Sequence, residues 1–299
     1  MRKLVLVLGL TCACTPALAA QENPQEPAWA FPATQQGVAA EIANPARDGD
    51  TAARAVAYPR VPQTAPQIVR EGKNGNGVCQ GCHLPYGLGQ PQSAPLTGLP
   101  VAYFVRQMND FTSGARGAYR PQMATFAQNM SAEEIRETAE YYAAQRVVPW
   151  IEVRETDTVP RTFVTARDIV SRYPDGSAEP INGRIVEVSN TFTSPYELER
   201  PAYVAYVPPG SLARGAELVN NGGGKTAACG TCHGPALKGM NDVPGIAGRS
   251  AVHGARQLLE FRNGTRGGPS AESMAGVVEN LADADIVAIS AYLASLPPV

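Results

Sequence analysis

Two short motifs in the chain carry residue types that can do redox chemistry. They are Cys79-Gln80-Gly81-Cys82-His83 and Cys229-Gly230-Thr231-Cys232-His233. Each reads Cys-x-x-Cys-His, the pattern by which haem c is attached to a protein. Cysteines three positions apart share one face of a helix, so both sulfurs can bond the vinyl groups of one porphyrin. The histidine that follows can supply an imidazole nitrogen to the iron. The spacing therefore predicts two covalently bound haem c groups, with His83 and His233 as iron ligands.

A Cys-x-x-Cys pair can also be half of a zinc site or a thioredoxin-like redox pair. A zinc site would need the two distant pairs to converge on one ion. It would also leave unexplained why a histidine follows both pairs. A thioredoxin-like pair needs a strand–helix–strand surround, which the flanking sequence does not indicate. We therefore favour haem attachment over both alternatives.

The chain repeats itself around these motifs. Cys79 and Cys229 are 150 positions apart. At this offset, residues 65–116 align with residues 215–266 without a gap. One extra residue near Ala271 then shifts the offset to 151. Matching residues outside the motifs are Gly98 and Gly248, Arg106-Gln107 and Arg256-Gln257, Phe111 and Phe261, and Gly114-x-Arg116-Gly117 and Gly264-x-Arg266-Gly267. Such self-similarity indicates a duplicated module.

The duplication also selects the second ligand of each iron. A haem c iron often takes a methionine thioether opposite the histidine. Only Met123 and Met274 align with each other, and we predict that they bind the two irons. The other candidates, Met108, Met130 and Met240, align with Leu258, Leu281 and Gln90, which favours core or surface positions for them. His253 aligns with Tyr103, so we expect it to be a helix residue beside the haem and not a ligand.

Arg116 and Arg266 lie in glycine-flanked turns at matching positions of the two halves. A guanidinium group pairs with a carboxylate in a two-pronged way, so either arginine could bind a haem propionate. The alternative is a solvated turn arginine. Recurrence in both halves favours the haem.

On the two motifs, the Gly-x-Arg turns, Met123 and Met274, the chain resembles the diheme class I c-type cytochromes, which are two fused cytochrome c domains. The resemblance covers residues 65–146 and 211–297. It implies a helical fold for each domain, with an N-terminal helix crossing a C-terminal helix and a partly exposed haem edge. It also implies a proline whose carbonyl orients the histidine. Pro244 matches that proline, whereas the first half has Ala94-Pro95, displaced by one position.

The amino terminus predicts export. Arg2-Lys3, the apolar run to Leu10 and the small residues before Ala19-Ala20 are typical of a signal peptide cleaved near that point. Removing it takes away Cys12 and Cys14, so all four remaining cysteines lie in the motifs. We expect a mainly α fold of two tandem cytochrome c-type haem domains with a β-rich connecting segment. The predicted order is a signal peptide (1–20), an extended N-terminal strap (21–64), domain 1 (65–146), the connecting segment (147–210) and domain 2 (211–299).

Patterning places several elements within this plan. A helix is predicted over 100–112, and Ser131 with Glu134 forms a capping-box pattern before the last helix of the first half. The last helix of the second half carries Ile286, Ile289 and Leu293 on one face. Alternating residues predict strands at 150–154, 184–188 and 203–207. The connecting segment could be a buttress for the haem domains or a docking surface, and we favour the buttress.

Electron transfer is the function that these features favour. A net charge of −2 shows no basic excess, which argues against nucleic-acid binding. We expect a periplasmic carrier, either a shuttle or the cytochrome subunit of a dehydrogenase complex. Its partners would be a dehydrogenase, an oxidase or another cytochrome, and it would reach a membrane only through a partner. The alternative is a diheme enzyme of the peroxidase or thiosulfate-oxidising type with one substrate-accessible haem. Two matching methionines and the lack of a spare cysteine favour a carrier over an enzyme, and a non-redox binding module is a remote third choice.

Overall fold

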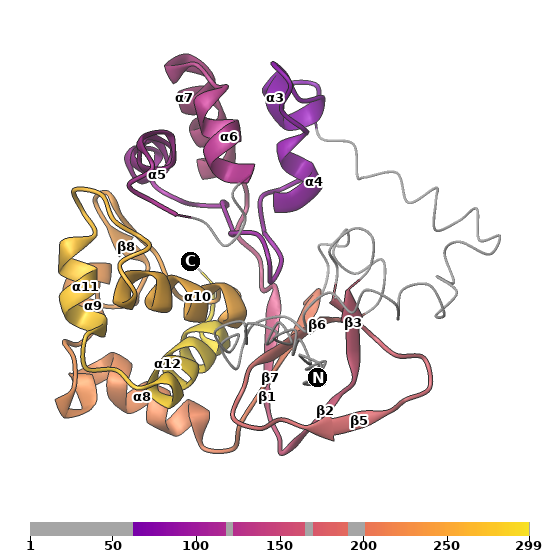
Figure 1. Ribbon diagram of the computed structural model, residues 1–299, viewed down its shortest axis with the longest axis vertical. Coiled ribbons are helices and arrows are strands. Elements are labelled where there is room, and N and C mark those ends of the chain that lie inside the picture. The colour runs from indigo at the N-terminus through magenta and orange to yellow at the C-terminus, as the bar shows by residue number, and fades with distance from the viewer. Residues whose placement is uncertain (1–61, 118–121, 165–169, 191–200, 299) are drawn as a thin grey trace, which may run out of the picture.

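The computed structural model describes residues 62–117, 122–164, 170–190 and 201–298. The predicted signal peptide and all but the end of the predicted strap lie outside these ranges. Within them, no helix is long and apolar enough to cross a bilayer. The first half of the chain lies at the top of Figure 1, the second half at the lower left, and most of the strands at the lower right.

The first half is built from helices around one small core. They are α3 (Gln67–Arg70), α4 (Cys79–His83), α5 (Val101–Ser113), α6 (Gln122–Gln128) and α7 (Ala132–Ala143). The prediction over 100–112 is confirmed by α5, which buries Phe104, Met108 and Phe111. The capping box is confirmed as well, because Ser131 Oγ accepts from Glu134 N (3.2 Å) and Glu134 Oε2 accepts from Ser131 N (2.8 Å).

The second half repeats this arrangement. Its elements are α8 (Ser211–Asn221), η2 (Gly222–Gly224), α9 (Gly230–His233), β8 (Gly239–Met240), β9 (Val243–Pro244), α10 (Ala251–Arg262), α11 (Glu272–Val278) and α12 (Asp283–Ser295). The expected crossing of first and last helices is the packing of α8 on α12. A Cβ at Gly215 would lie 2.1 Å from the carbonyl oxygen of Ala288, so the two backbones meet there. With Ala282 at the cap, only half of a capping box forms, from Ala282 N to Asp285 Oδ2 (3.1 Å).

The connecting segment is rich in strands, as predicted. They are β1 (Ile151–Glu155), β2 (Thr158–Pro160), β3 (Thr162–Val164), β4 (Val170–Arg172), β5 (Ala178–Pro180), β6 (Val186–Ser189) and β7 (Tyr203–Val207). β7 lies between β1 and β6, parallel to β1 with Ile151 opposite Tyr203 and antiparallel to β6. β2 pairs with β5, and β3 pairs with β4. β1 and β7 lie side by side next to α12, and both strands begin at the end that faces the first half (Figure 1).

The sheet corrects one expectation about α12. The sequence predicts a helix with a single apolar face, but every residue from Asp285 to Ala291 is buried. The reason is that α12 packs on α8 and α10 and also contacts β1 and β7. Strands of the connecting segment therefore complete the second core, in which Val188, Ala205 and Val207 join residues of the helices.

Candidate haem sites

Each Cys-x-x-Cys-His motif forms a single helical turn, which is α4 in the first half and Cys229 with α9 in the second. Burial raises the pKa of the Cys79 thiol to about 12 and that of Cys229 to about 11, so both are protonated at neutral pH. No group of three or more His, Cys, Asp or Glu side chains that could hold a metal occurs among the residues that the structure describes. The two cysteine pairs therefore do not converge on one ion, as a zinc site would require.

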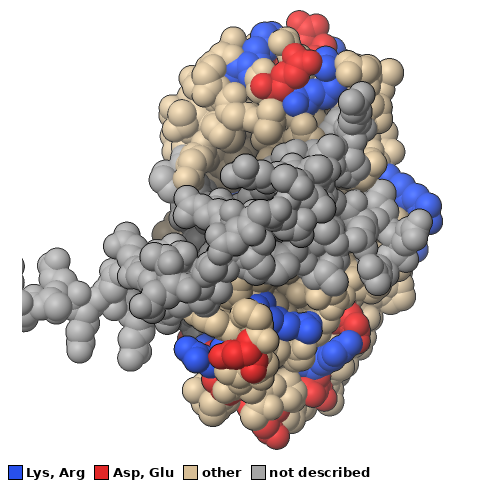
Figure 2. Space-filling model, turned by 90° about the vertical axis from the view of Figure 1, so that its right-hand side faces the viewer, with Lys and Arg blue, Asp and Glu red and all other residues tan. Residues whose placement is uncertain are grey.

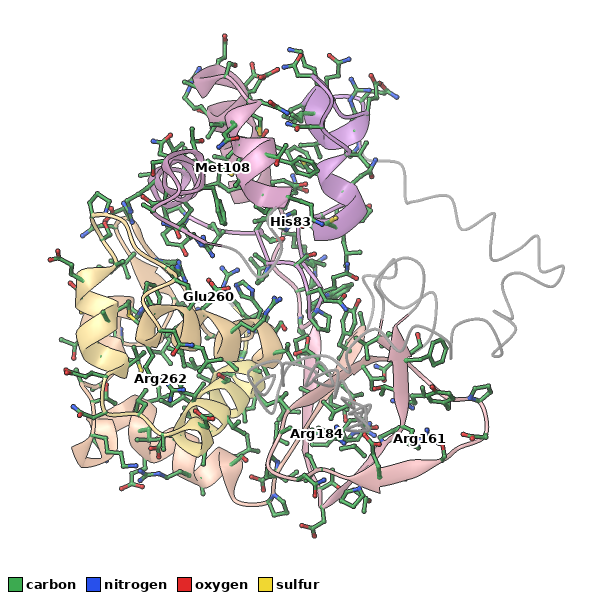
Figure 3. All side chains as sticks on the ribbon, in the orientation of Figure 1. His83, Met108, Arg161, Arg184, Glu260 and Arg262 are labelled. Carbon is green, nitrogen blue, oxygen red and sulfur yellow. The ribbon has the colours of Figure 1, made fainter. Side chains whose placement is uncertain are left out.

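The two motif histidines are held in the same way. His83 Nδ1 lies 2.8 Å from the carbonyl oxygen of Ala94, and His233 Nδ1 lies 2.8 Å from that of Pro244. Burial lowers the pKa of both imidazoles, which favours the neutral ring. A neutral ring that donates from Nδ1 to a carbonyl presents an unprotonated Nε2, the atom that an iron ligand needs. His83 is labelled in Figure 3, beneath the helices of the first half.

The carbonyl contact explains how the first half does without a matching proline. The role expected for Pro244 is confirmed by its hydrogen bond with His233. In the first half the acceptor is Ala94, which is the aligned position, and not Pro95. A backbone carbonyl accepts a hydrogen bond whatever the side chain, so the displaced proline leaves the contact intact.

The candidate methionines occupy corresponding short helices. Met123 is the second residue of α6 and Met274 the third residue of α11, and each is half-buried against the core of its own half. Met108 is buried in the first core, where Figure 3 shows it on α5, and Met240 is 48% exposed. The core and surface positions expected for Met108 and Met240 are thus observed. Ligation of iron by Met123 and Met274 stays a prediction.

Arg116 and Arg266 meet across the boundary between the two halves, where their backbones form an antiparallel bridge. Two further backbone hydrogen bonds flank it, from Gly117 N to Thr265 O (2.7 Å) and from Gly267 N to Ala115 O (2.8 Å). The two Gly-x-Arg turns therefore pair with each other, and the duplicated halves are related across this bridge by an approximate two-fold relation.

The arginine side chains cross the same boundary. Gln107 Oε1 accepts from Arg116 Nη1 (2.7 Å) and from Arg266 Nη2 (2.8 Å). Gln257 Oε1 accepts from Arg116 Nη2 (2.7 Å) and from Arg266 Nη1 (2.7 Å). Arg266 Nη2 also donates to the hydroxyl of Tyr103 (2.7 Å). Each guanidinium group is thus held by one glutamine of its own half and one of the other half.

Within the described residues, the two guanidinium groups of this cluster bind neutral acceptors. No carboxylate in the described part of the chain forms an ion pair with Arg116 or Arg266, and the buried Nε of Arg116 donates to none of the described residues. Burial and the charge of Arg266 lower the pKa of Arg116 to about 10. The solvated-turn interpretation is therefore wrong. Haem carries propionate carboxylates, which would supply the missing charge, so the arginines fit that group. Their pairing with propionates stays a prediction.

Other contacts between the halves were missed by sequence reasoning. Arg106 Nη1 binds Asp242 Oδ2 (2.5 Å), and the aligned Arg256 Nη2 binds the carbonyl of Pro91 (2.8 Å). Arg249 Nη1 donates to the carbonyl of Pro95 (3.2 Å). The repeat held part of the signal, because Arg106-Gln107 recurs as Arg256-Gln257. His253 lies half-buried on α10 beside Arg256, as a helix residue.

The loops that follow the two motifs differ sharply in exposure. Residues 84–92 are nearly all buried, whereas most of the aligned residues 234–242 are exposed. Leu84 and Leu88 pack with Trp150 and Tyr203 at the end of the connecting sheet, and Trp150 Nε1 donates to the carbonyl of Gly89 (3.0 Å). The sequence matches this difference, since the positions of Leu84 and Leu88 are Gly234 and Lys238 in the second half. The connecting segment therefore covers residues 84–92 and leaves most of residues 234–242 exposed to solvent.

Comparison with known proteins places these features in a family. The cytochrome c family matches residues 212–297. Cytochrome c4 of Stutzerimonas stutzeri is 30% identical over 148 residues, 44% of this chain and 69% of that protein. The thiosulfate dehydrogenase electron acceptor of Thiomonas intermedia is 24% identical over 225 residues, 73% of this chain and 78% of that protein. Among solved structures, a thiosulfate dehydrogenase from Marichromatium purpuratum matches with a TM-score of 0.53 at 23% identity, over 78% of this chain and 39% of the other.

These matches agree with the two motifs and with the repeated helical halves. They establish covalently bound haem c as the cofactor and electron transfer as the activity. They also confirm the predicted fold class, a mainly helical chain of two cytochrome c-type domains with strands between them. The chain belongs to the diheme c-type cytochromes, the family of cytochrome c4.

Proposed function

We propose that this diheme cytochrome is an exported periplasmic carrier, which takes electrons from one redox protein and passes them to another through both haems. Each half would hold one haem and keep its iron ligated on both faces. The proposed haem-binding residues are Cys79, Cys82, His83, Met123 and Arg116 in the first half, and Cys229, Cys232, His233, Met274 and Arg266 in the second.

The protein side of the mechanism is the fixing of the ligands. Bound haem supplies an iron that gains and loses one electron. The chain holds His83 and His233 neutral and oriented through the carbonyls of Ala94 and Pro244, each 2.8 Å from Nδ1. Ligand side chains held in one place need little rearrangement when the charge of the site changes, which suits a carrier. A methionine on the other side of each iron would leave no position for substrate, which disfavours the peroxidase alternative.

The observation that carries the proposal is the crossed arginine cluster between the halves. Arg116 and Arg266 share Gln107 and Gln257 as acceptors at 2.7–2.8 Å. The cluster fixes the two halves in one relative position. It also places two positive charges, the buried Arg266 and the half-buried Arg116, where propionates from both sites could reach them. A fixed spacing and a shared electrostatic environment favour electron exchange within the chain.

The exposure of the second loop supports a docking site on the second half. Lys238 and the 48% exposed Met240 lie on that loop, whereas the connecting segment covers the loop of the first half. We propose that the second half contacts the partner and that a dehydrogenase is the donor to test first, because relatives include electron acceptors of thiosulfate dehydrogenase. Figure 2 shows acidic and basic side chains interspersed at the top and the bottom of the molecule.

A redox titration of the purified holoprotein, followed by visible and near-infrared spectra, tests the proposal. We expect two one-electron haems, both low-spin, with the methionine–iron band at the red edge accounting for two irons. Rapid binding of carbon monoxide or peroxide by one iron would favour the enzyme instead. Periplasmic fractionation and mass spectrometry of the mature amino terminus test export, and retention of residues 1–20 in the cytoplasm would contradict it.

A further inference from the structure

The turn before each motif contacts the helix that carries the candidate methionine. In the first half, Asn76 Nδ2 donates to the carbonyl of Phe126 on α6 (3.1 Å). In the second half, Thr226 Oγ1 donates to the carbonyl of Val277 on α11 (2.6 Å). Asn76 and Thr226 align at the offset of 150, and each lies three residues before the first cysteine of its motif. Two different side chains therefore make the same contact at the same place.

The acceptor has the same relation to the methionine in both halves. Phe126 follows Met123 by three residues, and Val277 follows Met274 by three residues. Residues three apart lie nearly one turn apart on the same side of a helix. α6 and α11 are single short helices, so fixing that carbonyl fixes the backbone from which the methionine extends. The last carbonyls of a helix have no partner inside it, and Thr226 supplies one for Val277. The Phe126 carbonyl accepts from Asn129 N (3.2 Å) as well as from Asn76.

A second contact anchors the same turn to the last helix of each half. Lys73 Nζ binds Glu134 Oε1 (2.6 Å) at the start of α7, and Lys225 Nζ binds Asp285 Oδ2 (2.5 Å) near the start of α12. The first half adds a hydrogen bond from Asn129 Nδ2 to Asn76 Oδ1 (3.3 Å). The turn that leads into the cysteines is thus tied both to the helix that carries the methionine and to the last helix of its half.

We infer that Asn76 and Thr226 are positioning residues for the axial methionines, an inference that rests on the proposed ligation by Met123 and Met274. The motif cysteines would hold the haem, and the side chain of Asn76 or Thr226 in the turn beside them holds the methionine helix. That bond keeps the sulfur from leaving the iron. Without it, the helix moves away more often and the sixth position opens to other ligands.

The test is exogenous ligand binding to the oxidised holoprotein. In the Thr226→Val variant the side chain keeps its shape but cannot donate. We expect the second haem to bind imidazole about fivefold faster, the size of one net hydrogen bond, with a weaker methionine–iron band. Thr226→Ser should restore the wild-type rate. Asn76→Val should act on the first haem alone, and Asn76→Thr, which installs the donor of the second half, should restore it.

Thr138→Val is the matched control, because Thr138 is buried on α7 and its hydroxyl has no partner among the described residues. A purely structural role for Thr226 would lower the urea midpoint but leave imidazole binding unchanged. That result in both halves would overturn the inference. Met274→Ala separates this outcome from failure of the proposed function: if its spectrum matches wild type, Met274 is not the ligand. If its spectrum changes while Thr226→Val binds imidazole at the wild-type rate, the ligand stands and the positioning role is wrong.

Discussion

Replacing Gln257 with leucine should weaken the junction of the two halves. Gln257 Oε1 accepts one hydrogen bond from Arg116 and one from Arg266, each 2.7 Å long, and leucine accepts neither. A hydrogen bond to a charged donor is worth roughly 1.5–3 kcal/mol. Gln257 is half-buried, so water recovers part of the loss. We therefore expect Gln257→Leu to lower the free energy of unfolding by about 3 kcal/mol, measured by urea denaturation followed by circular dichroism.

The duplication supplies an internal check on this value. Gln107 Oε1 accepts from the same two arginines at 2.7 and 2.8 Å, and Gln107 Nε2 donates to Asp110 as Gln257 Nε2 donates to Glu260. Gln107→Leu should therefore cost the same within about 0.5 kcal/mol. Gln67→Leu, at an exposed position of α3, is the control and should change stability by less than about 0.5 kcal/mol. Wild-type stability of either junction variant would refute the crossed cluster as the link between the halves.

Three further changes test other parts of the structure. Gly215→Ala should lower the free energy of unfolding by about 1–3 kcal/mol, because the added methyl group would clash with the Ala288 carbonyl. Urea denaturation measures this change, with Gly254→Ala as the control, because a methyl group there makes only ordinary contacts. Trp150→Phe removes the donor to the Gly89 carbonyl, so amide hydrogen exchange should rise in residues 84–92 and stay unchanged in 234–242; equal change in both loops would contradict the covering role. Burial raises the pKa of Glu187 to about 7 from its ordinary 4.5, so the folded state holds this proton more tightly than the unfolded state and stability falls as pH rises from 4.5 to 7. Glu187→Gln should remove roughly 3 kcal/mol of that fall, and an unchanged pH profile of urea midpoints would contradict it.

The haem sites could be read from the sequence because their chemistry is local. Five consecutive residues place the cysteines and the histidine on one helical turn, and the repeat selects Met123 and Met274 over the other methionines. The resemblance implies a proline carbonyl as the partner of His83, whereas the contact uses the backbone carbonyl of Ala94. A side-chain pattern cannot reveal a partner that acts through its main chain.

What the sequence could not supply is contact between distant segments. Patterning gave α12 one apolar face, but strands β1 and β7 bury another side of it, and β1 precedes it by more than a hundred positions. The repeat marks Arg116 and Arg266 as matching residues, and their pairing with propionates stays a prediction. Their mutual contact depends on how the two halves dock, which no spacing within one half encodes.

Duplication makes the differences between the halves as informative as their similarities. Leu84 and Leu88 stand where the second half has Gly234 and Lys238, and the connecting segment packs on the leucines only. A glycine and a lysine give a sheet nothing apolar to bury, so the same segment could not cover the second loop equally well. The difference in exposure therefore follows from the residues of the two loops. As a result, two halves with the same motif differ in how far solvent and partners can reach them.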